Sequence, residues 1–85
     1  MNIDIISFKK IYKGGLLASV SVRLGDFLTI NEIKILQTKQ GLTTALPVEK
    51  FRIHSQVFMI PAVEIINSEL QTQIETAVLN EFAKH

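Results

Sequence analysis

The chain has no cysteine and no tryptophan, and it has only two prolines and four glycines among 85 residues. The absence of cysteine excludes disulfides, thiolate nucleophiles and cysteine metal ligands. It fits a reducing compartment, so we expect a cytoplasmic protein. The first ten residues, MNIDIISFKK, carry an acid and two lysines and no long apolar run, which is not typical of a signal peptide. No stretch approaches the roughly 18 apolar residues of a membrane span, so no membrane partner is predicted.

The residues that carry catalysis or bind metals are equally sparse. His54 has no cysteine, no second suitably placed histidine and no carboxylate pair near it in the sequence, so it does not indicate a metal site. Ser68 is better explained as a helix cap than as a nucleophile. The segment Lys13-Gly14-Gly15 lacks the Walker pattern of a phosphate-binding loop. We therefore predict no enzyme, no cofactor, no metal and no small-molecule substrate.

Apolar residues, by contrast, are abundant for so short a chain. They make up 47% of the residues, and the mean hydropathy is +0.28. A chain of this length forms one domain, residues 1–85, and buries only about two-thirds of its unfolded surface. The apolar excess predicts a second buried surface, and a homodimer is the simplest form of it.

Charge is unevenly distributed although the net charge is only +1. Residues 1–60 hold eight Lys and Arg against four acids, whereas residues 61–85 hold one lysine against four glutamates. A basic body of this kind can bind a polyanion. The alternative is an ordinary solvated surface with no such partner.

Four segments have the pattern of antiparallel strands. Residues 16–24 alternate between two faces with period two, and glycine turns at 14–15 and 25–26 separate them from strands at 3–12 and 27–37. The apolar parity changes between Ile30 and Ile33, which predicts a β-bulge at Asn31-Glu32 that sets Glu32 and Lys34 opposite Ile33 and Ile35. Gly41 is expected to take a positive φ before a fourth strand at 42–46, which Pro47 ends. We interpret residues 48–55 as a loop and residues 56–60 as a short edge strand.

The C-terminal segment predicts one amphipathic helix. Leu70, Ile74, Ala77, Val78 and Phe82 recur at helical spacing. Ser68 followed by Gln71 is typical of a capping box. Packed on the strands, this helix gives an α+β fold, with an antiparallel sheet of four to five strands and one C-terminal helix.

Several of these segments together resemble the stage V sporulation protein G (SpoVG) family of septation regulators. They are GGLLASVSVRL, NEIKIL, GLTTALP and NSELQTQIETAVLNEF, in this order along nearly the whole chain. The resemblance implies a small cytoplasmic, dimeric bacterial protein that binds DNA or RNA and affects septation, sporulation or other gene expression. Nothing in the composition or periodicity shows this role.

The same resemblance implies which residues bind nucleic acid. Lys50 matches a basic position after the proline of the fourth strand, Arg52 is placed to substitute for its basic neighbour, and Lys9, Lys10 and Lys34 match basic positions in the strands. Val48 and Glu49 depart from the family's usual pattern after this proline, and no Asp-Gly loop follows. Basic side chains of this kind bind phosphate oxygens without selecting sequence. Solvated lysines, Lys39 included, are the alternative. Phe51, the one aromatic residue flanked by basic residues, is expected to be buried.

A second hypothesis is a non-enzymatic protein-interaction module. The apolar excess and the edge strand expected at residues 56–60 would allow a partner to add a strand to the sheet.

Overall fold

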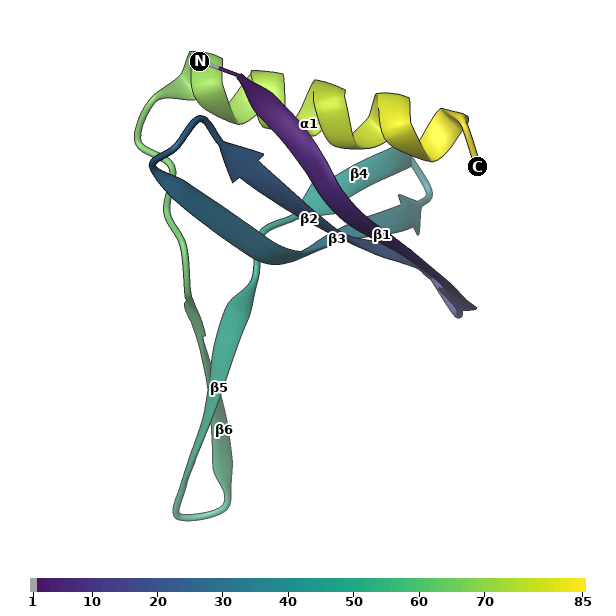
Figure 1. Cartoon of the computed structure of the whole chain (residues 1–85). Coiled ribbons are helices and arrows are strands. Elements are labelled where there is room, and N and C mark those ends of the chain that lie inside the picture. Colours follow the sequence, from purple (N-terminus) through teal and green to yellow (C-terminus); the bar gives the residue numbers. More distant parts are fainter. Residues whose placement is uncertain (1) are drawn as a thin grey trace.

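The computed structural model describes residues 2–85, and its first four strands form one antiparallel sheet in the order β1-β2-β3-β4. A separate two-stranded sheet pairs β5 with β6, and one helix follows. The elements are β1 (Ile3–Lys13), β2 (Leu16–Leu24), β3 (Leu28–Thr38), β4 (Gly41–Ala45), β5 (Val48–Ile53), β6 (Gln56–Pro61) and α1 (Ser68–Ala83). Helix α1 covers one face of the larger sheet, and the β5–β6 hairpin projects from the other side (Figure 1). The predicted α+β class is confirmed.

The hydrophobic core lies between α1 and the two central strands. Alternation along β2 and β3 turns every second side chain toward the helix, and each valine, leucine or isoleucine buried there contributes roughly 1.5–3 kcal/mol. The buried residues are Ala18, Val20, Val22 and Leu24 from β2, Ile30, Ile33 and Ile35 from β3, and Ile74 and Val78 from α1. The strand ranges predicted for residues 3–12, 16–24, 27–37 and 42–46 match β1 to β4 within one residue at each end.

The predicted bulge in β3 is present. Val22 pairs with Ile30 and Val20 pairs with Ile33, so Asn31 and Glu32 together face Ser21. Glu32 adopts a left-handed φ of 61°, which absorbs the extra residue. As predicted, Ile33 and Ile35 are buried on the helix side, while Glu32 and Lys34 both line a hollow on the other side of the sheet.

The N-cap of helix α1 is Asn67, and the helix itself begins at the next residue, Ser68. The Asn67 side-chain oxygen accepts a hydrogen bond from the Leu70 backbone N–H at 3.0 Å. The prediction that Ser68 caps the helix is therefore wrong, because Ser68 is the first helical residue. Asn and Ser are about equally good caps, so the two adjacent residues compete for this position in the sequence. Helix α1 falls short of the length and apolarity needed to cross a membrane, and it is the one helix within residues 2–85.

The prediction of a loop at residues 48–55 is also wrong. Residues Val48–Ile53 form β5, which pairs with β6 along its whole length, from Val48↔Pro61 to Ile53↔Gln56. The turn consists of His54 and Ser55, both with positive φ, 50° and 69°. Two left-handed residues in succession match the type I′ turn that suits the twist of a tight hairpin. The expected edge strand at 56–60 is present, but it belongs to this separate hairpin and not to the main sheet.

Candidate nucleic-acid interface

The β5–β6 hairpin has two faces of different chemistry. Directly paired residues of an antiparallel ladder point to the same face, and successive residues alternate. The pairs Lys50↔Met59 and Arg52↔Val57 therefore form one face, here called the basic face. The pairs Glu49↔Ile60, Phe51↔Phe58 and Ile53↔Gln56 form the opposite face, here called the apolar face. The two residues predicted to contact phosphate thus lie side by side, two positions apart on one strand.

This arrangement separates the basic residues from the nearest acid. Glu49 precedes Lys50 in the sequence, yet the alternation of β5 turns its carboxylate to the apolar face. Among residues 2–85, the ion pairs are Arg23–Asp4, Lys84–Glu81 and His85–Glu81. Neither Lys50 nor Arg52 takes part in them, so both cations are available to a ligand.

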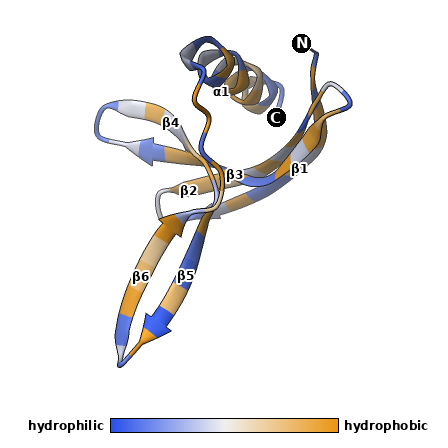
Figure 2. Ribbon diagram, turned by 90° about the vertical axis from the view of Figure 1, so that its left-hand side faces the viewer, coloured by the Kyte–Doolittle hydropathy of each residue, from blue (hydrophilic) through white to orange (hydrophobic). Residues whose placement is uncertain are grey.

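Phe51 is not buried within the chain, which contradicts the prediction. It remains 44% exposed, and all six residues of each hairpin strand are exposed. Figure 2 shows apolar residues along the projecting strands, well away from the helix and the core. The core lies between α1 and the main sheet, so nothing within the described chain covers this face of the hairpin.

A second group of basic residues lies on the outer face of the main sheet, away from α1. Lys9 pairs with Ser19, and Ser19 pairs with Lys34, so the three side chains form a row across β1, β2 and β3. They border a hollow of about 370 Å³ that is also lined by Ser7, Ile11, Ser21 and Glu32. Hydroxyl and ammonium groups together can donate hydrogen bonds to a phosphate oxygen. The serines could not be found from the sequence, because their alignment with the lysines depends on the register across three strands.

Lys10 does not join this row. Lys10 pairs with buried Ala18. Phe8, two residues earlier on the same strand, lies against Phe82 of the helix. Lys10 is therefore on the helix side of β1, while Lys9 is on the outer side. Lys39 lies in the β3–β4 turn, after Thr38 ends β3, and it borders neither the row nor the hairpin.

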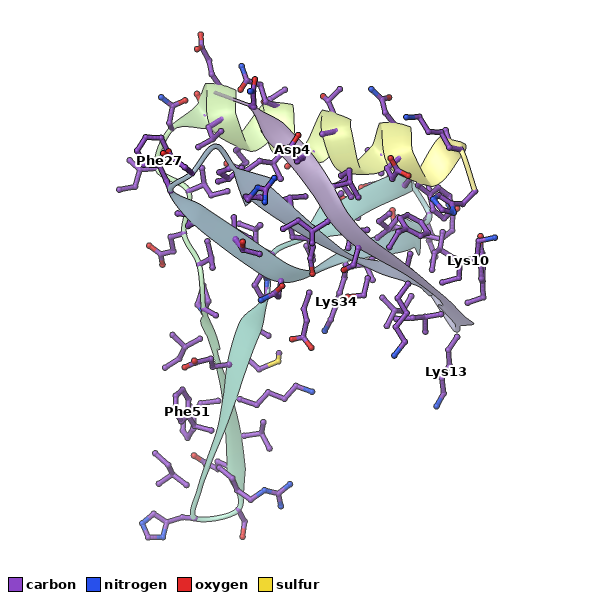
Figure 3. All side chains as sticks on the ribbon, in the orientation of Figure 1. Asp4, Lys10, Lys13, Phe27, Lys34 and Phe51 are labelled. Carbon is purple, nitrogen blue, oxygen red and sulfur yellow. The ribbon has the colours of Figure 1, made fainter. Side chains whose placement is uncertain are left out.

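The basic face of the hairpin and the outer face of the sheet are turned to the same side. In Figure 3, Phe51 points to the left of the hairpin, and Lys34 lies below the sheet to its right. Because Lys50 and Arg52 lie on the hairpin face opposite Phe51, they point to the side of Lys34. The hairpin and the outer sheet face thus form two arms of a corner whose inner side carries Lys9, Lys34, Lys50 and Arg52.

Comparison with known proteins agrees with the family resemblance. The model of the SpoVG family matches residues 1–84, almost the entire chain. No curated protein matches the sequence.

Proposed function

Because the chain belongs to the SpoVG family, a family of regulators associated with sporulation and septation, we propose that it acts by binding DNA or RNA. The interface consists of the basic face of the hairpin, Lys50 and Arg52, with Lys9 and Lys34 on the outer sheet face extending it. The observation that carries this proposal is the sharing of one projecting face by Lys50 and Arg52, with Glu49 on the other face.

The chemistry of these residues favours the sugar–phosphate backbone over base edges. Arg52 offers a planar guanidinium for bidentate contact with phosphate, and the three lysines act as point charges. The aromatic residues of the hairpin, Phe51 and Phe58, lie on the face away from the cations. Stacking on single-stranded bases would need aromatic side chains among the basic residues. We therefore propose regulation through backbone-driven binding, without a catalytic step.

The first experiment is fluorescence anisotropy with labelled duplex DNA and single-stranded RNA, each at about 50 and 200 mM salt. Each neutralised phosphate contributes about 0.9 to the slope of log K against log salt for duplex DNA. The double variant Lys50→Ala with Arg52→Ala is expected to weaken binding at least about tenfold and to lower that slope by roughly two. Lys84→Ala, which removes one charge at the helix C-terminus, is the control and should change neither quantity much. Unchanged affinity in the double variant would contradict the assignment of this face.

Neighbouring lysines provide a sharper comparison on the sheet. Lys9→Ala removes a charge from the outer face, and Lys10→Ala removes the same charge from the helix side of the same strand. The proposal expects a lower salt slope for Lys9→Ala, by about one, and a smaller change for Lys10→Ala. Equal losses for the two variants would mean that the ligand follows the edge of β1 and not the row.

The second candidate is a protein-interaction module. This function is supported by the two-stranded hairpin. The outer edges of β5 and β6 carry backbone N–H and C=O groups that pair with no other strand of the described chain, and a partner strand could pair with these groups. A stoichiometric protein that remains bound after nuclease treatment, together with no nucleic-acid binding at 50 mM salt, would favour this function over the first.

A further inference from the structure

A cavity of about 390 Å³ lies where the base of the hairpin, the linker to α1 and the helix itself meet, and we call it the neck cavity. Its apolar lining comes from β3, α1 and the segments on both sides of the hairpin, and consists mainly of Ile33, Leu46, Val63, Ile65 and Ile74. Pockets that bind small molecules have volumes of roughly 300–1,000 Å³ and combine apolar walls with a few polar groups. The neck cavity has this size and this kind of lining.

The polar groups of the neck cavity give it a negative charge. Glu64 of the linker and Glu75 of α1 line it, together with Thr44 and Gln71. Neither carboxylate takes part in an ion pair within residues 2–85. No lysine or arginine lines this cavity, whereas the hollow on the outer sheet face is lined by two lysines and one glutamate. The neck cavity therefore suits a cation and repels the phosphates that the outer face suits.

We propose that the neck cavity binds a small organic cation, in which an ammonium group is attached to an apolar body of about the size of a phenylalkyl chain. The apolar body lies against Ile33, Leu46 and Ile74. The ammonium group donates charge-assisted hydrogen bonds to the carboxylates of Glu64 and Glu75. A bare metal ion would leave the apolar lining unused. This proposal does not depend on nucleic-acid binding.

The position of the cavity links its ligand to the hairpin. Val48 and Pro61 form the first pair of the hairpin, and both line the cavity together with Pro47. The Ala62 N–H donates a hydrogen bond to the Pro47 carbonyl at 3.0 Å, next to these residues. A ligand in the cavity contacts both sides of this narrow neck at once. It should therefore stabilise the closed neck, because a ligand favours the conformation that it binds.

A titration of the isotope-labelled full chain with phenylbutylammonium, followed by NMR at neutral pH, tests the proposal. For a ligand with about a dozen non-hydrogen atoms, we expect a dissociation constant on the order of 100 µM. The shifted amide signals should belong to the residues that line the neck cavity. Phenylbutanol has the same apolar body without the charge, and it should bind to the same residues at least about fivefold more weakly, since each partly exposed carboxylate contributes roughly two- to fivefold. Phenylbutyrate, an anion, should bind more weakly still.

Matched variants test the role of the two carboxylates. Glu64→Gln combined with Glu75→Gln should lower the affinity for phenylbutylammonium to that for phenylbutanol, and should leave the affinity for phenylbutanol unchanged. Glu69→Gln is the control, because Glu69 lies in the first turn of α1 and does not line the neck cavity. This variant should bind phenylbutylammonium as the wild type does. The NMR spectrum of each variant without ligand checks that it is folded.

Amide hydrogen exchange provides a readout at the neck. Saturating phenylbutylammonium should slow the exchange of the Ala62 N–H, and should do so much less in the double variant at the same concentration. Equal affinity for phenylbutylammonium and phenylbutanol, or no binding of either at about 5 mM, would overturn the proposal. Signal shifts confined to the exposed strands β5 and β6 would also overturn it. So would shifts of the cavity residues that grow with protein concentration alone, because they would assign the cavity to a second copy of the chain.

Discussion

The main sheet with its helix and the projecting hairpin use similar residues in opposite ways. In β2 and β3, seven apolar side chains are buried against α1, whereas every residue of β5 and β6 is exposed. The strands of both regions contain valine and isoleucine, together with leucine in the main sheet and phenylalanine in the hairpin. The difference teaches that apolar content alone does not define a core. What matters is whether a second layer lies within reach of the strand, and within residues 2–85 only the main sheet has one.

The largest expected effect comes from truncating matched isoleucines in the two regions. Ile35 is fully buried and Ile53 is 55% exposed. Ile35→Ala should lower the free energy of unfolding by about 2–5 kcal/mol, because it removes buried methyl groups and leaves a cavity. Ile53→Ala should lower it by less than about 0.5 kcal/mol. Urea denaturation followed by circular dichroism, at a concentration that keeps the chain monomeric, measures both. Similar losses in the two variants would show that the hairpin is part of the cooperative unit.

An intermediate effect is expected at the point where the linker from the hairpin joins the packed helix. Asn67→Ala removes the side-chain oxygen that accepts from the Leu70 N–H, and should cost about 1 kcal/mol of stability. Ser68→Ala, one residue later and already helical, should cost much less. Thermal unfolding of the two variants compares them. If Ser68→Ala were the more damaging change, Ser68 and not Asn67 would be the cap in solution.

The smallest effect on stability is expected when the hairpin is removed altogether. Val48 pairs with Pro61, and the Ala62 N–H donates to the Pro47 carbonyl at 3.0 Å, so the two ends of the hairpin are close together. Replacing residues 49–60 by a short Gly-Ser turn should change the free energy of unfolding by less than about 1 kcal/mol, since a shorter loop costs little entropy to close. The nucleic-acid binding proposed for the basic face of the hairpin should be lost. A shortened chain that no longer folds would refute the independence of the two regions.

Most of the main sheet and the helix could be predicted because the local sequence patterns there agree with the structure that tertiary packing stabilises. The alternation of β2 is regular, the parity change between Ile30 and Ile33 marks the bulge, and Gly41 has the positive φ of 118° that its turn requires. Each of these signals depends only on residues near one another in the sequence. The sequence pattern predicts the helix cap one residue too late, because Asn67 and Ser68 are both good capping residues.

The hairpin could not be predicted because its signals conflict. Each face mixes apolar with charged side chains, so VEKFRIHS shows no clean division into a buried and a solvated side. Its turn also lacks the Asn-Gly or Asp-Gly pair that marks a type I′ turn, and uses His54 and Ser55 instead. Without the strand, the common face of Lys50 and Arg52 could not be inferred. Likewise, the row of Lys9, Ser19 and Lys34 depends on long-range pairing with two register shifts.

The narrow neck of the hairpin gives the molecule a mechanical property. The hairpin joins the body through Pro47 and Ala62, which share one backbone hydrogen bond, and its strands of six residues extend about 20 Å from there. The hairpin is therefore a lever: a rotation of about 10° at the neck moves its tip by about 3.5 Å, a distance close to one residue of strand. The angle between the two arms that carry the cations is thus set at a single point. A small change of angle there alters the distance of Lys50 and Arg52 from Lys9 and Lys34.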